Sequence, residues 1–263
     1  MTRIPTSAYL VLATPQSGSV ALCDSLHESG VAGHPLQHFA VSESTGLAVQ
    51  PREYFDGIDE PEILDLMPPL VNAAVKPESA GDWWARILRD GTGENGVWGG
   101  QLMWAQTEDL LSRVHRLDGL DDADLATALR TLLGAPKLIL MVRGNKVAQA
   151  VSLWRSLLMR SEPRQNGGAE GADGAAYRFA GIDHLRQKLE FEEACWREWL
   201  ATHRLPYREV RYADLVSEPR AIVADVLRAL GQEERVPESE WLRGRRDRVT
   251  VQWAERYREE SVA

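Results

Sequence analysis

The sequence has few cysteines and no long apolar run, and each absence excludes a class of protein. Its two cysteines, Cys23 and Cys195, lack the spacing of a metal site, so we expect reduced thiols in a cytosol and no bound metal. The opening apolar run, 9–13, is too short to span a membrane and is followed by Pro15 and Gln16. No signal peptide is visible, so we predict a cytoplasmic protein with no membrane partner.

Positive charge is also scarce. The chain has 30 lysines and arginines against 39 acidic residues, and this net charge of −9 argues against nucleic acid as a partner. We attribute the rarity of lysine to codon bias. The 263 residues, 44% of them hydrophobic, suffice for one domain, and no repeat is visible. We predict a single domain, 1–263, with a mobile loop around 161–174 that is rich in Gly, Pro, Glu and Gln.

Short apolar runs alternate with helical patterns along the chain. The runs that predict strands lie at 9–13, 96–104, 137–143 and 208–212. Helical patterns occur at 20–30, 61–68, 81–89, 105–115, 122–133, 147–154, 176–203 and 219–230. This alternation predicts an α/β fold with a mainly parallel central sheet flanked by helices. In such folds a ligand binds at the carboxyl ends of the strands.

A turn of small residues, Ser17-Gly18-Ser19, joins the first strand to the first helix. Free backbone N–H groups and the positive end of the helix macrodipole meet at such a turn, so it can bind an anion. Gly18 allows close approach of the backbone to a ligand, and the serine hydroxyls can donate to phosphate oxygens. The alternative is a plain connection in which a serine caps the helix.

Several motifs occur together, in order and at consistent spacing. They are Ala8-Tyr9-Leu10-Val11-Leu12-Ala13, Ser17-Gly18-Ser19, Gly30-Val31-Ala32-Gly33, Gln50-Pro51-Arg52-Glu53, Gly96-Val97-Trp98-Gly99-Gly100, Leu102-Met103-Trp104, Gln149-Ala150-Val151-Ser152 and Glu255-Arg256-Tyr257-Arg258. On these motifs the chain resembles the bacterial trehalose sulfotransferase family over nearly its whole length. The resemblance implies a P-loop-kinase-like sulfotransferase fold and, in many members, a homodimer.

The resemblance also implies a cofactor and residues that bind it. Family members transfer a sulfuryl group from 3′-phosphoadenosine 5′-phosphosulfate (PAPS) to a sugar hydroxyl. By position, Ser17, Gly18 and Ser19 would hold the 5′-phosphosulfate, and Arg143 and Ser152 the 3′-phosphate. An arginine at the end of a strand can also be no more than a solvated terminus.

The chain departs from the family pattern where the family places charged catalytic groups. Gln16 replaces an arginine, Gln101 a lysine and Gln37 the glutamate that serves as general base, while Val20 replaces a threonine and His34 a second glutamate. Loss of two cationic donors should cost roughly 3–6 kcal/mol in the transition state. Loss of a general base typically costs about 10²–10⁴-fold in rate.

These departures suggest other catalytic candidates. His38 and His34 could act as general base or acid, and the amides of Gln16, Gln37 and Gln101 could polarise a carbonyl. Each histidine could equally be a solvated loop residue. The tryptophans Trp98, Trp104 and Trp154 would wall the pocket if they do not simply pack in the core. The basic run Arg243, Arg245, Arg246 and Arg248 could bind a 3′-phosphate or be a solvated surface.

Three functions remain open from the sequence. The first is a repurposed enzyme that acts on an organic small molecule of specialised metabolism by cyclisation, rearrangement or dehydration, without PAPS. The second is a PAPS-dependent sulfotransferase, with His38 as base. The third is a non-catalytic protein that only binds a small molecule. We expect the first because three charged groups have become neutral glutamines, and we do not expect trehalose as acceptor because 161–174 differs in composition from the family's substrate region.

Overall fold

The computed structural model describes residues 5–74, 78–161, 176–233, 235–237 and 248–262. Four parallel strands form one sheet in the order β2-β1-β3-β4: β1 (Ser7–Ala13), β2 (Val97–Met103), β3 (Lys137–Val142) and β4 (Tyr207–Arg211). In register, Leu12 lies beside Leu102 on one side and Leu140 on the other. The strand order reverses direction at β1, the usual position of a ligand site in an open parallel sheet.

Helices connect the strands and cover both faces of the sheet. They are α1 (Ser19–Glu28), α2 (Pro61–Leu64), α3 (Ala80–Gly91), α4 (Thr107–Val114), α5 (Leu125–Leu133), α6 (Lys146–Ser161), α7 (Phe179–Thr202), α8 (Tyr212–Ser217), α9 (Pro219–Leu230) and α10 (Arg248–Glu260). Two short 3₁₀ helices, η1 (Pro51–Phe55) and η2 (Trp104–Gln106), complete the described elements. The predicted α/β fold with a parallel central sheet is confirmed.

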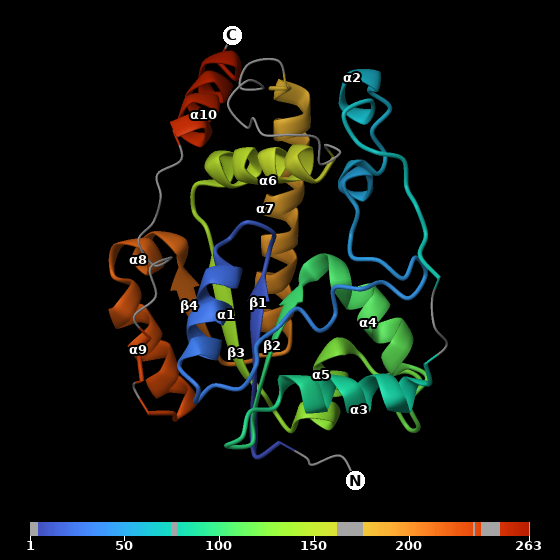
Figure 1. The fold of residues 1–263 in the computed structure, drawn as a ribbon, viewed down its shortest axis with the longest axis vertical. Coiled ribbons are helices and arrows are strands. Elements are labelled where there is room, and N and C mark those ends of the chain that lie inside the picture. Colours follow the sequence, from blue (N-terminus) through green and yellow to red (C-terminus); the bar gives the residue numbers. More distant parts are fainter. Residues whose placement is uncertain (1–4, 75–77, 162–175, 234, 238–247, 263) are drawn as a thin grey trace.

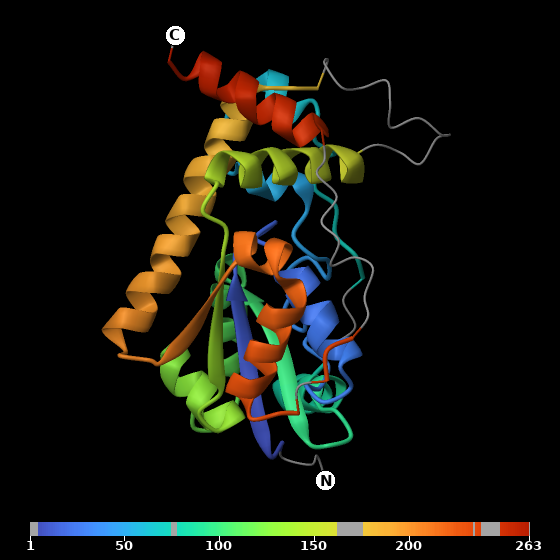
Figure 2. The ribbon, with the colours of Figure 1, turned by 90° about the vertical axis from the view of Figure 1, so that its left-hand side faces the viewer.

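The alternation of side chains along β1 divides the core in two. Leu10 and Leu12 pack with residues of α3, α4, α5 and α7, whereas Tyr9 and Val11 pack with α1 and α9. Successive residues of a strand point to opposite faces, so an unbroken apolar strand must be covered on both. In Figure 2, α7 runs along one side of the sheet, and Trp196 on this helix donates from Nε1 to the carbonyl of Ala13 at 3.0 Å.

A third apolar cluster lies beyond the carboxyl ends of the strands. It joins α6, the first half of α7, α10 and η1 around the buried side chains of Trp154 and Phe55. In Figure 1, α6 crosses above the upper ends of the strands, and α10 lies above α6. These helices therefore enclose the end of the sheet where the turn after β1 is located.

Most predicted helices lie within a few residues of the observed ones, and their ends are the least accurate part of the prediction. The helices α8 and α10 were not predicted. The predicted mobile loop lies outside the described residues, apart from Ser161 at the end of α6. Of the basic run, only Arg248 belongs to the described part. Across the described residues, no helix combines the length and the apolar character that a membrane span requires.

Candidate active site

The turn between β1 and α1 presents backbone N–H groups to a ligand. Gly18 is the N-cap of α1, and no side-chain hydrogen bond caps this helix. The first N–H groups of a helix have no intrahelical partner, and the positive end of the macrodipole adds to their attraction for anions. Ser17 is fully buried beside them, and its Oγ has no hydrogen-bond partner among the described residues. The turn therefore has the properties of an anion site.

Gly18 is required by both conformation and space. Its φ is 97°, in the left-handed region, and an added Cβ would lie 2.6 Å from Cδ2 of Tyr212. Tyr212 begins α8 directly after β4, and the guanidinium carbon of Arg143 lies 4.4 Å from the centroid of its ring. Three strands thus bring the turn, Arg143 and Tyr212 together at their carboxyl ends.

Arg143 and Ser152 lie in the same cavity as the turn. Arg143 donates from Nη1 to the carbonyl of Gln16 at 2.9 Å and from Nη2 to that of Ala148 at 3.3 Å. Burial lowers the pKa of Arg143, but an arginine remains charged because its ordinary pKa exceeds 12. The Oγ of Ser152 donates to the carbonyl of Ala148 at 2.8 Å.

A buried hydrogen-bond network holds the turn in place. Gln149, which has no exposed surface, donates from Nε2 to Oγ1 of Thr14 at 2.9 Å and to the carbonyl of Pro15 at 2.7 Å. Lys146 donates to Oε1 of Gln149 at 3.0 Å and pairs with Glu193 on α7 at 2.6 Å. The first helical turn of α6 therefore fixes the chain that leads into the anion site.

We call the cavity above the turn the α6–α10 cavity, and its charge is one-sided. Its volume is about 670 Å³, and it is bounded by the turn, α6, α8 and α10. Three arginines line it, Arg143, Arg155 and Arg258, and its described lining contains no aspartate or glutamate. Arg155 donates to Oγ1 of Thr250 at 3.1 Å and so joins α6 to α10. A cavity with this lining attracts anions.

A second cavity, the η1–α6 cavity, adjoins the first. It has a volume of about 540 Å³, and Gln16 and Ser156 line both cavities. Its lining includes Val20 and Gln37 from the site predicted by sequence, the acidic residues Glu53, Asp56 and Glu108, and the cations Arg160 and Lys188. Gln16 therefore lies where a group could pass from a ligand in one cavity to a ligand in the other.

Gln101 does not face either cavity. Its side chain is 1% exposed and donates from Nε2 to Oγ of Ser19 at 2.6 Å, across the gap between β2 and α1. This amide holds the serine of the turn and is committed to a structural bond. The sequence suggested that three glutamines act together on one ligand. The structure places Gln16 and Gln37 on the η1–α6 cavity, but it places Gln101 away from both cavities.

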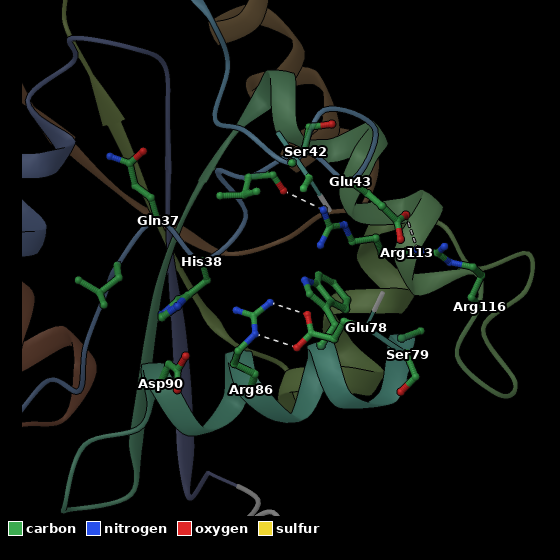
Figure 3. Close-up of a pocket in the computed structure, with 16 residues that line it drawn as sticks. Gln37, His38, Ser42, Glu43, Glu78, Ser79, Arg86, Asp90, Arg113 and Arg116 are labelled. Carbon is green, nitrogen blue, oxygen red and sulfur yellow. Dashed lines mark hydrogen bonds and ion pairs between the residues drawn. The ribbon is translucent and has the colours of Figure 1, made fainter. Parts of the chain in front are cut away.

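The two candidate histidines lie outside both cavities. Nδ1 of His34 is 2.9 Å from Nδ1 of His27 at the surface. His38 lines another cavity, of about 850 Å³ between α3 and α4, which we call the α3–α4 cavity and in which Arg86 pairs with Glu78 (Figure 3). Gln37 lines both this cavity and the η1–α6 cavity, so the two adjoin at Gln37.

The ring of His38 is held by the backbone. Its Nε2 lies 3.0 Å from the carbonyl of His34 and 3.2 Å from that of Gly99, so this nitrogen carries the proton. Burial lowers the pKa of His38, while the two backbone bonds oppose the shift. Figure 3 shows Gln37 and His38 projecting away from each other, so the histidine does not stand in for the glutamine beside it.

The tryptophans predicted to wall the pocket pack in the core instead. Trp98 and Trp154 have no exposed surface, and their Nε1 atoms donate to the carbonyls of Ile87 and Ala176. Trp104 packs edge-on against Trp196, with 4.9 Å between the ring centroids. None of the three lines either cavity. The alternative of core packing, also open from the sequence, is the observed one.

Within the described part of the chain, no cluster of three or more His, Cys, Asp or Glu side chains could hold a metal ion. A parallel sheet with an anion-binding turn after its first strand and a cationic cavity above it is the arrangement of an α/β protein that binds an anionic ligand at the carboxyl ends of its strands.

Comparison with known proteins identifies the family. The family model of Stf0 sulphotransferase matches residues 8–260, and the chain belongs to this family. It is 35% identical to trehalose 2-sulfotransferase of Mycobacterium tuberculosis (strain ATCC 35801 / TMC 107 / Erdman) over 257 residues, which cover 96% of this chain and 95% of the relative. It is 36% identical to trehalose 2-sulfotransferase of Mycolicibacterium smegmatis (strain ATCC 700084 / mc(2)155) over 261 residues, with 97% and 96% covered.

The predicted resemblance is thereby confirmed, together with membership of an enzyme family. The cytoplasmic location, the single domain and the homodimer stay predictions. Sequence reasoning missed Tyr212, Arg155 and Lys188, which line the cavities from elements far apart in the chain. The one available signal was that Tyr212 ends a predicted strand, as Arg143 does.

Proposed function

We propose that this protein is a PAPS-dependent sulfotransferase that acts on a hydroxyl group of a small molecule. The observation that carries this proposal is the α6–α10 cavity, in which three arginines and no described acidic residue face the uncapped turn. The two trehalose 2-sulfotransferases, matched over nearly their whole length, support the same activity.

The residues present suit both charged ends of PAPS. The N–H groups of the turn and the unpartnered Oγ of Ser17 can donate to the 5′-phosphosulfate. Arg143, Arg155 and Arg258 are the cations available to the 3′-phosphate. PAPS, when bound, supplies an activated sulfuryl group. The amide of Gln16, at the junction of the cavities, can donate to an oxyanion without adding a charge.

The expected loss of cations applies to only part of the site. Gln16, in place of a cation, lies at the junction of the two cavities, and Gln101 lies away from both. The α6–α10 cavity is still lined by three arginines, of which Arg143 and Arg258 match the family pattern. Sulfuryl transfer, like phosphoryl transfer, depends mainly on positioning and charge stabilisation, so these arginines favour it.

A reaction without sulfuryl transfer is the second candidate. It is favoured by one observation, that Gln16 and Gln37 are both neutral and both line the cavity available to the acceptor. Its substrate would be an organic molecule of specialised metabolism, bound through neutral hydrogen bonds.

The test combines binding with turnover. We expect adenosine 3′,5′-bisphosphate to bind with micromolar affinity in calorimetry, and labelled PAPS to label at least one member of a hydroxyl panel that includes trehalose. Binding without any labelling would favour the second candidate or a non-catalytic binding protein. No binding would contradict the proposal.

A further inference from the structure

The aromatic ring of Tyr212 connects two parts of the α6–α10 cavity that belong to different strands. Tyr212 follows β4, whose neighbour in the sheet is β3 and not β1. Arg143 and Tyr212 each come one residue after the last paired positions of β3 and β4, so they are neighbours at this edge. The ring nevertheless reaches Gly18 after β1, where an added Cβ would lie 2.6 Å from Cδ2 and 3.2 Å from Cε2 of Tyr212. The ring therefore crosses the end of β3.

The guanidinium of Arg143 is held at two of its nitrogens and covered by this ring. Nη1 donates to the carbonyl of Gln16 and Nη2 to that of Ala148, so three of its five N–H donors remain for a ligand. The guanidinium carbon lies over the ring of Tyr212, 4.4 Å from the centroid. The negative face of an aromatic ring attracts a cation, and the attraction grows when the pair is removed from water. The ring thus restrains the guanidinium further without using any of its donors.

The carbonyl of Ala148 brings Arg143 together with Ser152. It accepts from Nη2 of Arg143 at 3.3 Å and from Oγ of Ser152 at 2.8 Å, and both side chains line the α6–α10 cavity. Under the proposed function, this wall of the cavity is available to the 3′-phosphate and the turn to the 5′-phosphosulfate. The ring of Tyr212 contacts Gly18 in the turn and Arg143 in the wall.

Packing alone would give Tyr212 a different role. The residue is half-buried, and its ring also packs against the apolar cluster that contains Val11 and Met141. A ring that served only as packing would support the turn and the arginine alike. Its loss would then weaken the binding of every nucleotide to the same extent.

We propose that Tyr212 is a positioning residue that holds Arg143 in place relative to the turn and thereby makes the affinity for a nucleotide depend on its 3′-phosphate. This inference rests on the proposed function. A ligand with a phosphate at each site then meets groups that are already ordered, and less free energy is lost on binding. A nucleotide with a 5′-phosphate alone occupies the turn and gains nothing from the restrained arginine.

The test compares adenosine 3′,5′-bisphosphate with adenosine 5′-monophosphate by calorimetry, with displacement titrations for the weaker probe. The wild type should bind the bisphosphate at least about 100-fold more tightly, through two or more charge-assisted hydrogen bonds. Tyr212→Leu should lower this ratio about tenfold, because the guanidinium loses the aromatic face, and should leave the affinity for the monophosphate within about twofold. An unchanged ratio, or an equal loss for both probes, would overturn the inference and leave the proposed function standing.

Two matched variants isolate the contribution of the ring. Tyr212→Phe keeps the aromatic face and should keep the wild-type ratio. A ratio that falls as far as in Tyr212→Leu would assign the effect to the hydroxyl and contradict the inference. Tyr207, at the opposite end of β4 and 42% exposed, provides the same substitution on the same strand, and Tyr207→Leu should leave both affinities unchanged. An equal fall of the ratio in Tyr207→Leu would assign it to the strand as a whole and also overturn the inference.

A double-mutant cycle shows whether Tyr212 acts through Arg143. Once the arginine is gone, the ring has nothing left to position, so adding Tyr212→Leu to Arg143→Ala should change the ratio by no more than about twofold. A further tenfold loss would mean that the ring acts on the ligand directly, and the positioning role would be wrong. If neither probe binds the wild type, the proposed function itself fails.

Discussion

The two cavities that meet at Gln16 differ in charge and in how closely they keep the family pattern. The α6–α10 cavity has three arginines and no described acidic residue, whereas the η1–α6 cavity mixes two cations with three carboxylates. Arg143 and Ser152 match the pattern in the first, while Gln37 and Val20 depart from it in the second. Gln16, which also departs from the pattern, lines both cavities. The proposed function therefore predicts that the nucleotide side is largely kept and that the acceptor side has changed.

The charges of the η1–α6 cavity limit the kinds of acceptor that it can bind. A cavity in which Glu53, Asp56 and Glu108 outnumber Arg160 and Lys188 disfavours an anionic molecule and suits a neutral or cationic one. The neutral Gln16 and Gln37 on this cavity then reflect a new acceptor more readily than the loss of PAPS.

Removal of Arg143 should give the largest effect. Two hydrogen bonds to a charged group contribute about 1.5–3 kcal/mol each, so Arg143→Ala should weaken the binding of adenosine 3′,5′-bisphosphate at least about 100-fold. Calorimetry measures it. Arg130→Ala, on the exposed side of α5, is the control and should bind like wild type. Unchanged affinity in Arg143→Ala would mean that the nucleotide does not bind in the α6–α10 cavity, which the three arginines line.

Loss of the Gln149 bonds should come next, because they hold the chain that leads from β1 into the turn. Gln149→Leu leaves the carbonyl of Pro15 and the hydroxyl of Thr14 without their buried donor, which should lower the free energy of unfolding by about 1–3 kcal/mol. Urea unfolding measures the loss. The exposed Gln187→Leu is the control, and an equal loss in both variants would show that the buried network has no special part in stability.

Local pattern was enough to predict that the turn and Arg143 lie together. Ser17, Gly18 and Arg143 each follow a strand, and the carboxyl ends of parallel strands share one edge of the sheet. The pattern of apolar residues also predicted the sheet and most helices. These features depend on short-range periodicity, which a single sequence displays directly.

The residues around the η1–α6 cavity are brought together by packing between distant parts of the chain, which a single sequence does not display. From the sequence alone, the amide of Gln101 could be catalytic. In the fold it is committed to a hydrogen bond with Ser19, which lies 82 positions away in the sequence. Trp98 and Trp154 could line a pocket as far as the sequence shows, and only the fold reveals that both are fully buried. Lys188 lies on a helix whose apolar pattern was recognised, but nothing local shows that this face of α7 meets η1.

A cation restored at the junction should sharpen the contrast between the cavities. Gln16→Arg places a charged donor between the two ligands, so we expect kcat/KM for sulfuryl transfer to rise about tenfold. The affinity for adenosine 3′,5′-bisphosphate should rise as well, because Gln16 also lines the α6–α10 cavity. Gln16→Lys is the comparison, since it adds charge without the planar fork. A fall in kcat/KM would indicate that the neutral amide is needed for the present acceptor.

The carboxylate of Glu192, which is buried on α7, should make the stability of the fold depend on pH. Because folding raises the pKa of Glu192, the unfolded chain loses this proton first, and the free energy of unfolding falls as pH rises from about 4.3 to the folded pKa. Within that interval the contribution is about 1.4 kcal/mol for each pH unit. Glu192→Gln should remove this slope in urea unfolding, and Glu190→Gln should keep it. The same slope in both variants would assign it to other groups.

The smallest effect should follow a change of His38, which lines neither the α6–α10 cavity nor the η1–α6 cavity. Its Nε2 is committed to the carbonyls of His34 and Gly99, and its ring faces the α3–α4 cavity. His38→Gln retains a donor for these carbonyls, so kcat should change by no more than about twofold, with the same pH profile. A loss of about 10²-fold or more would make the histidine the base. A base at this position would have to reach the acceptor, so the loop that carries His38 would then move toward the η1–α6 cavity, which the neighbouring Gln37 already lines.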